Sequence, residues 1–223
     1  MKVLVVGANG NMGRRYCSIL DHLEVDYDTH EINQPSSKVK YNYILVATPT
    51  TDHLHTLDEL SKYQNNAKIL CEKPISKTTS IYTKRKLDHI LELFSDNLFM
   101  VNQYAYYSEN IEIPKESVTL YDFYNSGKDG ISWDCIQLIH LAKGAIVLKN
   151  ESPIWKCKIN GVSLDREQID LCYIKMIKDF LNDGKEYGRL WGLDDIRVSH
   201  KKARAHERLF NRDSSPIDVN EIT

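Results

Sequence analysis

The sequence has little of what marks membrane, secreted or nucleic-acid-binding proteins. No apolar run approaches the roughly 18 residues that a membrane span needs. No long basic run suggests nucleic acid, and the formal net charge is only -2, with both signs mixed along the chain. Hydrophobic residues make up 42% and charged residues 27%, as in an ordinary globular protein. These features predict a cytoplasmic protein with no membrane or nucleic-acid partner.

Cysteine is scarce and follows no pattern. The chain has five cysteines, which are Cys17, Cys71, Cys135, Cys157 and Cys172. An odd number without a CxxC pair argues against a disulfide framework and against a zinc site. We therefore predict reduced, buried thiols and no metal site.

The first 105 residues alternate between strand and helix patterns. The apolar run Val3–Val6 is too short for a signal peptide and stops at a glycine, which favours a first strand. Strands are predicted at 2–6, 25–32, 43–47, 67–71 and 98–103, and helices at 12–23, 52–64 and 79–94. This alternation predicts an α/β domain, residues 1–105, with a parallel sheet covered by helices on both faces.

The pattern changes after residue 105. Strands are predicted at 117–124, 145–148 and 154–162, and helices at 133–143, 168–181 and 194–209. The helix over 168–181 is strongly amphipathic and ends at Asn182-Asp183-Gly184. Residues 106–223 are therefore expected to form a second, compact domain.

A glycine turn joins the first strand to the first helix. Gly7, Gly10 and Gly13 follow one another at intervals of three, so the spacing is G-x-x-G-x-x-G rather than the commoner G-x-G-x-x-G. A Rossmann dinucleotide site needs such a turn, because the backbone must approach a pyrophosphate that lies at a helix N-terminus. The residues predicted to hold the phosphates are Gly7, Asn9, Gly10, Asn11, Met12 and Gly13. A plain strand–helix turn is the alternative.

Charged residues near this turn bear on the choice of nicotinamide cofactor. An acidic residue at the end of the second strand usually binds the ribose hydroxyls, and Glu31 is the candidate, with Asp28 as its competitor. A carboxylate there favours NAD, because it repels the 2′-phosphate of NADP. Arg14 and Arg15 follow Gly13 and could reach such a phosphate, so NADP stays open. Either charged group could also be solvated surface.

Two further segments carry a family resemblance. Ala47-Thr48-Pro49 with His53 follows the third strand, and Glu72-Lys73-Pro74 follows the fourth. With the glycine turn before them, residues 1–105 resemble the Gfo/Idh/MocA family, the glucose–fructose oxidoreductase and inositol dehydrogenase group. The resemblance implies an N-terminal Rossmann domain and a smaller C-terminal α+β domain on a mostly antiparallel sheet, here shorter than is usual. It also implies hydride transfer between a nicotinamide and a carbinol carbon.

The resemblance assigns roles to particular residues. Thr48 and Pro49 would line the cofactor cleft, His53 would lie near the ribose, and Glu72 would belong to the cofactor site. Lys73 would lie at the nicotinamide end, where an ammonium can hydrogen-bond a substrate hydroxyl. Independently of the family, Gly7, Pro49 and Lys73 each follow a strand, and ligands of open α/β sheets bind beyond the carboxyl ends of strands. Lys73 as a solvated loop lysine and His53 as a structural histidine are the alternatives.

The second domain of the family usually carries an Asp and a His four residues apart on one helix, with the His as acid or base. Here Asp134 fits the Asp, but Leu138 stands four residues on, and His140 stands six residues on. On a regular helix these two side chains would not share a face. His140 could act from a shifted register, Lys73 or Tyr104 could replace it, His140 could simply pack in the core, or the site could do no chemistry.

Three functional hypotheses follow. The first is an NAD(P)-dependent oxidoreductase acting on a sugar, polyol or nucleotide-sugar, with Lys73, Asp134 and His140 as catalytic candidates and Tyr104 against the substrate. The second is a non-catalytic NAD-binding regulator or scaffold. The third is a reductase similar to dihydrodipicolinate reductase, which Glu72-Lys73-Pro74 argues against. The resemblance also allows a homodimer.

Overall fold

The computed structural model describes residues 1–31, 39–64, 66–107, 119–122, 131–141, 145–149, 157–159, 162–210 and 217–218. The chain divides into two compact units. The first comprises Met1–Val101 with Met176–Ile196, and the second comprises Asn102–Lys175 with Arg197–Thr223. These units differ from the contiguous stretches 1–105 and 106–223 predicted from the sequence, because a late segment of the chain packs with the first sheet.

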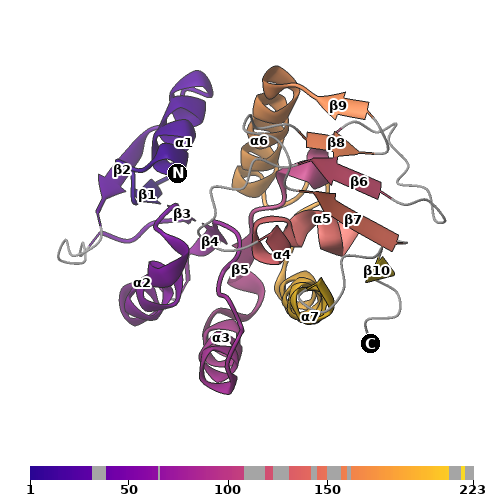
Figure 1. Cartoon of the computed structure of the whole chain (residues 1–223). Helices are drawn as coiled ribbons and strands as arrows, with labels where there is room; N and C mark the ends of the chain where they lie inside the picture. The colour runs from indigo at the N-terminus through magenta and orange to yellow at the C-terminus, as the bar shows by residue number, and fades with distance from the viewer. Residues whose placement is uncertain are drawn as a thin grey trace. The chain divides into compact units, whose positions relative to one another are not determined.

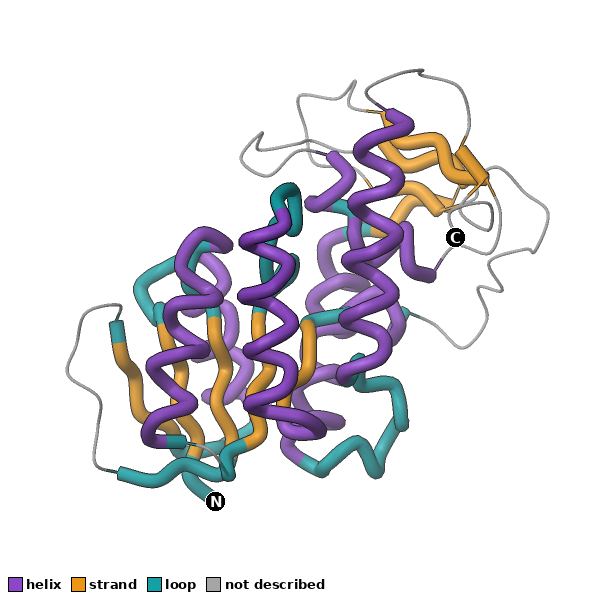
Figure 2. Tube along the Cα trace, turned by 90° about the horizontal axis from the view of Figure 1, so that it is seen from below, coloured by secondary structure: helices purple, strands orange, loops and turns teal. Residues whose placement is uncertain are grey.

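The first unit is built on a five-stranded parallel sheet with the order β2-β1-β3-β4-β5, as expected of a Rossmann domain. Its strands are β1 (Val3–Val6), β2 (Tyr27–His30), β3 (Tyr43–Val46), β4 (Lys68–Cys71) and β5 (Leu98–Met100). Figure 2 shows these strands side by side. The predicted parallel sheet is confirmed, although β5 is shorter than predicted, since a 3-10 helix, η2 (Gln103–Tyr106), follows it.

Helices cover both faces of this sheet. They are α1 (Asn11–His22), α2 (Thr50–Tyr63) and α3 (Ile81–Phe94), and a 3-10 turn, η1 (Ser95–Asn97), follows α3. The chain passes from β1 through α1 to β2 on one side of β1, and β3, β4 and β5 then follow on its other side. Because such crossovers are right-handed, α1 lies on one face of the sheet and α2 with α3 on the other (Figure 1). Strands β1, β3 and β4 are consequently buried on both faces, which is why they read as continuous apolar runs.

The end of α6 (Arg166–Leu181) and the loop after it belong to this first unit. The Phe180 ring meets Tyr43 edge-on at 5.3 Å and Phe99 at 6.0 Å between ring centroids. Further along, the Met100 N–H donates to the Trp191 carbonyl at 2.9 Å. We call residues 176–196 the return segment, because it brings the chain back to the sheet of the first unit.

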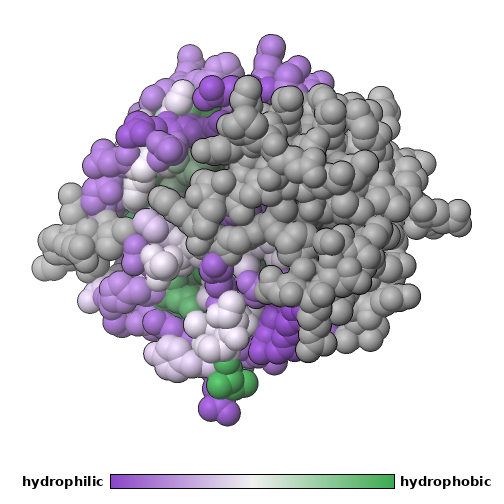
Figure 3. Space-filling model, viewed as in Figure 1, coloured by the Kyte–Doolittle hydropathy of each residue, from purple (hydrophilic) through white to green (hydrophobic). Residues whose placement is uncertain are grey.

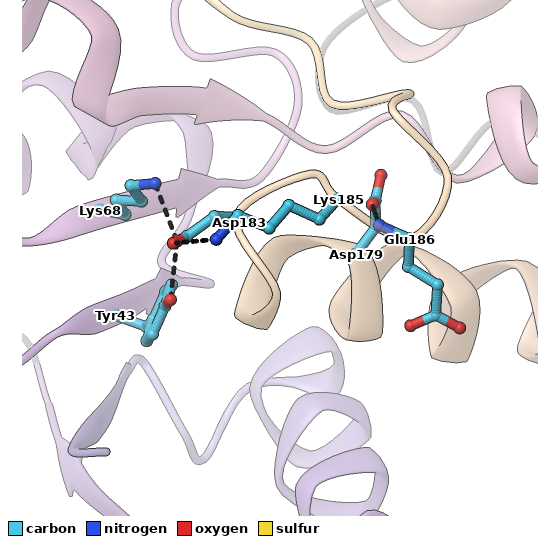
Figure 4. A network of polar contacts seen from close by, with 6 residues as sticks. All are labelled: Tyr43, Lys68, Asp179, Asp183, Lys185 and Glu186. Atoms are coloured by element: carbon cyan, nitrogen blue, oxygen red, sulfur yellow. Dashed lines mark hydrogen bonds and ion pairs between the residues drawn. The ribbon is translucent and has the colours of Figure 1, made fainter.

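A charged contact anchors the return segment at the amino ends of β3 and β4. The Asp183 carboxylate accepts hydrogen bonds from Lys68 Nζ at 2.8 Å and from the Tyr43 hydroxyl at 2.7 Å (Figure 4). The Lys68 ammonium, and after it the Tyr43 hydroxyl, lowers the pKa of Asp183 below its ordinary value of 3.8. Burial, together with this carboxylate, raises the pKa of Tyr43 to about 12.

A buried carboxylate organises the turn that follows α6. Asp179 is fully buried and accepts hydrogen bonds from four successive backbone N–H groups, those of residues 186–189, at 2.8 to 3.4 Å. Figure 4 shows the contact with Glu186. Gly184 and Gly188 have positive φ angles of 75° and 63°, which let the chain curl around this carboxylate.

Replacing Asp179 with alanine should therefore destabilise the protein strongly. Hydrogen bonds to a charged group contribute more than neutral ones, so losing the shared acceptor should cost on the order of 3 kcal/mol. Asp179→Asn keeps one carbonyl oxygen for these N–H groups and should recover part of the loss. Urea unfolding measures both variants, and an alanine variant within about 1 kcal/mol of wild type would contradict this account.

Asp183→Asn should change stability in a pH-dependent way. The folded-state pKa of Asp183 is lowered, so its stabilising contribution is present above pH 3.8 and is lost as the pH falls through the folded-state value. We expect the melting temperature of the variant to lie below that of wild type at pH 7 and to approach it as the pH falls below 3.8. Asparagine tolerates the positive φ of 61° at this position, so backbone strain does not confuse the result.

The matched control for that experiment is Asp96→Asn, which removes an exposed carboxylate in η1. The difference between this variant and wild type should not vary over the same pH range. An Asp183→Asn variant whose deficit is the same at pH 7 and at pH 3 would show that the ion pair does not stabilise the return segment.

The second unit combines short strands with helices. Its strands are β6 (Thr119–Asp122), β7 (Ala145–Lys149), β8 (Cys157–Ile159), β9 (Val162–Leu164) and β10 (Ile217–Asp218), and its helices include α4 (Ile131–Asp134) and α5 (Ile136–Leu141). Among the strands that the structure describes, β10-β7-β6 form one sheet and β8-β9 form a hairpin. The expected α+β composition is confirmed.

The expected antiparallel pairing is only partly right. β7 pairs antiparallel with β10 but parallel with β6. The physical reason is the connection, because α4 and α5 lie between β6 and β7, and a helical crossover returns the chain in the same direction. The segment 154–162, predicted as one strand, contributes to the two strands of a hairpin instead.

Helix α7 (Leu193–Phe210) closes the core of the second unit. The Trp133 indole N–H donates to Glu207 at 2.9 Å, and the Ser132 hydroxyl lies 2.9 Å from Nδ1 of His206. Burial lowers the pKa of His206 to about 4, so this ring is neutral at pH 7. These two contacts hold α4 against α7, and the neutral His206 ring adds no charge to the core.

On the face drawn in Figure 3, the described residues are mostly polar. Figure 3 shows hydrophilic residues over much of the coloured part of this face, with scattered hydrophobic ones. Large exposed apolar side chains include Ile81 and Tyr82 at the start of α3. None of the helices that the structure describes has the length and hydropathy needed to cross a membrane.

Candidate functional site

The register of the parallel sheet aligns the predicted cofactor segments. Val6 pairs with His30 on one side and with Val46 on the other, and Val46 pairs with Cys71. The residues that follow this row, Gly7, Glu31, Ala47 and Glu72, therefore all begin at the same edge. With strands about 4.8 Å apart, the four strands span roughly 14 Å. The structure thus brings together Glu31, the glycine turn, Thr48-Pro49 and Lys73, as predicted for a site at the carboxyl edge.

Each glycine of the turn has its own geometric reason. Gly7 has a φ of +83°, and a Cβ there would lie 3.0 Å from the Ala47 backbone. At Gly13 a Cβ would lie 2.1 Å from the Gly7 carbonyl oxygen, so only glycine lets α1 pack this closely on the turn. At Gly10, the N-cap of α1, a Cβ would lie 3.3 Å from the same oxygen, which is tight but tolerable.

This difference predicts unequal effects of two alanine substitutions. Gly13→Ala forces a backbone collision and should destabilise the protein by about 1–3 kcal/mol or more, as overpacking does. Gly10→Ala should stay within about 1 kcal/mol of wild type, because its φ of -71° suits alanine and the contact needs only a small shift. Thermal or urea unfolding compares the two, and an equal loss would contradict the geometry.

The two acidic candidates near the end of β2 have different contacts. Glu31 Oε1 accepts a hydrogen bond from the Asn9 N–H at 2.9 Å, so this carboxylate lies against the glycine turn. Asp28 lies within β2 and accepts a hydrogen bond from the Tyr41 hydroxyl at 2.9 Å. Of the two carboxylates, Glu31 is therefore the one that lies against the glycine turn, and its contact with a ribose stays a prediction.

The two arginines after the turn contact the protein itself. Arg14 donates from Nη1 to the Asn9 carbonyl at 2.5 Å and from Nη2 to Asn11 Oδ1 at 2.7 Å. Arg15 Nη1 lies 3.7 Å from Met12 Sδ. The exposed Arg14 side chain therefore braces the turn from outside.

Thr48, Pro49 and His53 have distinct environments after β3. Pro49 is exposed and precedes α2, whereas Thr48 is 5% exposed. His53 is buried, with Nδ1 2.9 Å from the Pro74 carbonyl and Nε2 2.7 Å from the Thr48 carbonyl. Since both ring nitrogens contact main-chain carbonyls, His53 joins the segments after β3 and β4, and its position near a ribose stays a prediction.

The segment after β4 is joined to α1 by a hydrogen bond. Glu72 is buried and accepts hydrogen bonds from the Tyr16 hydroxyl and, at 3.2 Å, from the Lys73 N–H. Lys73 itself is half-buried. Glu72 thus fixes the backbone at Lys73 relative to the helix that begins at the glycine turn, and its place in the cofactor site stays a prediction.

In the second unit, the predicted helix over 133–143 is broken. α4 ends at Asp134 and α5 begins at Ile136. Asp134 and His140 therefore do not lie on one regular helix, and the expectation that they point to different faces of such a helix does not apply. Both side chains are partly exposed, while their neighbours Ile136 and Ile139 are buried. The predicted pair therefore sits on two short helices, and its geometry cannot be read from sequence spacing.

Sequence reasoning missed two polar contacts around these helices. Gln137 on α5 is fully buried and donates from Nε2 to Gln103 Oε1 at 2.6 Å, which ties α5 to η2, where Tyr104 lies. Lys202 on α7 donates to the His140 carbonyl at 3.5 Å, and burial lowers the pKa of this lysine. A glutamine within an apolar run was the signal for the first contact, whereas no sequence signal marks the second.

Metal binding depends on how the His, Cys, Asp and Glu side chains of the described residues are placed. Within them, no group of three or more His, Cys, Asp or Glu side chains is placed to hold a metal ion. Burial raises the pKa of the Cys71 thiol well above its ordinary value and that of Cys172 to about 11, so both are weakly reactive at pH 7.

The sheet order and the glycine turn define the class of fold, a Rossmann-type unit together with an α+β unit. Solved structures share this fold over nearly the whole chain. A myo-inositol dehydrogenase from Corynebacterium glutamicum matches with a TM-score of 0.69 and 12% identity, covering 98% of each chain. The WlbA (WbpB) dehydrogenase from Thermus thermophilus, solved with NAD and UDP-GlcNAcA, matches with a TM-score of 0.64 and 10% identity over 92% of this chain and 94% of that one.

A third structure, UDP-N-acetylglucosamine 3-dehydrogenase GnnA from Acidithiobacillus ferrooxidans, matches with a TM-score of 0.65 and 13% identity, over 91% of this chain and 95% of that one. No protein-family model and no curated protein matches the sequence. At these identities the likeness establishes the fold, so the chain has the fold of Gfo/Idh/MocA-type dehydrogenases, as the resemblance predicted.

Proposed function

We propose that this chain is an NAD(P)-dependent oxidoreductase acting on a CH–OH carbon of a sugar, polyol or nucleotide-sugar, in the cytoplasm. The observation that carries the proposal is the row of Glu31, the glycine turn, Thr48 and Lys73 along one edge of the sheet. The likeness in fold to inositol and nucleotide-sugar dehydrogenases, one of them solved with NAD and UDP-GlcNAcA, supports the substrate class.

The edge fits a dinucleotide in two independent ways. Gly10 leaves the space above the turn without a side chain at the N-terminus of α1, where backbone N–H groups favour a pyrophosphate. The Thr48 hydroxyl oxygen is buried and, among the residues that the structure describes, has no hydrogen-bond partner. Because buried hydroxyls are usually satisfied, this atom points to a ligand that would supply the partner.

Each residue would then do a specific task. Glu31 would accept ribose hydroxyls, the N–H groups around Gly10 would hold the phosphates, and Thr48 would contact the cofactor between them. The bound nicotinamide would supply hydride transfer. Lys73 would donate a hydrogen bond to the substrate hydroxyl or carbonyl oxygen and stabilise negative charge that develops there.

Three further predicted site residues belong to the second unit. Asp134 and His140 are the proposed acid–base residues, and Tyr104 is the proposed substrate contact. The Gln137–Gln103 bond and the Lys202 contact with the His140 carbonyl hold the helices that carry them. The homodimer allowed by the resemblance stays a prediction.

The second candidate function is a non-catalytic NAD-binding protein of the same fold. The observation that favours it is that Asp134 and His140 lie on two separate short helices, α4 and α5, rather than one turn apart on a single helix. This candidate keeps the carboxyl-edge site of the first unit and predicts nucleotide binding without turnover.

Lys73→Ala separates the two candidates. For an enzyme, the change should lower kcat by about 100-fold or more, as expected for loss of a hydrogen-bond donor that stabilises the charge developing in the transition state. The Kd for NADH should change by less than about threefold, because the phosphates and ribose bind elsewhere along the edge. Steady-state kinetics on a panel of inositols, sugars and nucleotide-sugars, with NADH binding by fluorescence, measures both.

Lys84→Ala on the exposed side of α3 is the matched control and should change neither value. Wild-type protein that binds NADH but turns over nothing on the panel would favour the regulator. Binding of neither NADH nor NADPH would contradict both candidates.

A further inference from the structure

Helix α3 presents large apolar side chains at both of its ends. Ile81 is 62% exposed and Tyr82 is 71% exposed on the first turn, and Leu93 is 44% exposed on the last. Ser80 caps the first turn, since its hydroxyl accepts from the Thr83 N–H at 3.1 Å and the Thr83 hydroxyl accepts from the Ser80 N–H at 3.2 Å. The first-turn side chains are therefore exposed on a capped helix end.

The charges of α3 run opposite to the order that a helix dipole favours. The positive residues in its first half are Lys84, Arg85 and Lys86. The negative residues in its second half are Asp88 and Glu92. Anions stabilise the start of a helix and cations its end, and α2, α6 and α7 each carry an acidic residue in the first turn and a basic one in the last. The order of charges in α3 therefore does not serve the stability of this helix itself.

Two opposite charges lie on the outward side of α3. Arg85 and Glu92 are exposed, and seven residues, nearly two full turns, place them on one side of the helix about 10 Å apart along its axis. Among the described residues neither has an ion-pair partner, whereas Lys62 on α2 pairs with Asp58 and Glu59. Both charges are thus open to a partner from outside the chain.

We propose that α3 pairs with α3 of a second copy of this chain about a two-fold axis, with the two helices antiparallel. Arg85 of each copy would then lie level with the partner's Glu92, which gives two equivalent ion pairs. Tyr82 would lie about 3 Å along the axis from the partner's Leu93, within reach of contact. The two helix dipoles would run in opposite directions, which favours the same arrangement.

The charges of α3 match a second copy better than other partners. A parallel copy would place Arg85 beside Arg85 and Glu92 beside Glu92. A uniformly acidic partner, such as nucleic acid or an anionic membrane, would be repelled by Asp88 and Glu92. An antiparallel copy is self-complementary, because each charge meets its opposite.

The size of α3 sets the expected strength of the pair. The helix has 14 residues and is therefore about 21 Å long. Two such helices bury less than the roughly 1,600 Å² of a standard interface. We therefore expect a weak dimer, with a Kd on the order of 10–100 μM.

The test measures the dimer Kd by sedimentation equilibrium in wild type, Arg85→Glu, Glu92→Arg and the double variant. Each single reversal places like charges opposite each other twice, so it should raise Kd by about tenfold or more. The double variant restores opposite charges and should return Kd to within about threefold of wild type. Tyr82→Ser removes the apolar contact and should raise Kd by about 3- to 10-fold.

Arg197→Glu, which reverses an exposed charge on α7, is the control and should leave Kd unchanged. All variants change exposed side chains, so their melting temperatures should stay within about 2 °C of wild type. The inference is overturned if wild type stays monomeric up to about 1 mM, if the single reversals leave Kd unchanged, or if the double variant is as weak as the single ones. The proposed cofactor and substrate residues lie outside α3, so none of these results bears on the proposed function.

Discussion

The parallel strands β1 to β4 end in the same row of paired residues, and the rest of the first unit depends on this register. Val6, His30, Val46 and Cys71 lie in one row, so every segment that follows them begins at the same edge. Parallel strands can end together because each helix between them returns the chain to the same starting side. A slip of one residue in β1 or β4 would separate Gly7 or Lys73 from the edge that they share.

The two ends of this sheet are used differently. At the amino ends of β3 and β4, Tyr43 and Lys68 bind Asp183, and the return segment closes that end with an ion pair. At the carboxyl ends, the polar contacts brace the segments after the strands: Glu72 with Tyr16, His53 with two carbonyls, and Glu31 with Asn9. One end is therefore anchored to the return segment, and at the other end internal hydrogen bonds hold the segments that follow the strands.

The parallel sheet of the first unit could be predicted from the sequence, because continuous apolar runs and a glycine turn are local signals. The sequence placed Glu31, Thr48 and Lys73 at one edge for the same reason. It did not predict the return segment, since Phe180 against Tyr43 joins residues far apart in the chain. Hydrophobic periodicity did not predict the break at Cys135 either, because it assumes a regular helix. The sequence also predicted one strand over 154–162, where the structure has the antiparallel pair β8 and β9.

The central claim is that the carboxyl edge of the first sheet binds the dinucleotide. Amide chemical shifts of ¹⁵N-labelled protein, followed by NMR during titration with NADH, test it most directly. The account predicts that the amides of Asn9, Gly10, Thr48 and Lys73 shift, while those of Lys68 and Asp183 at the opposite end stay unchanged. Shifts confined to the amino ends of the strands, or no shifts at saturating NADH, would contradict it.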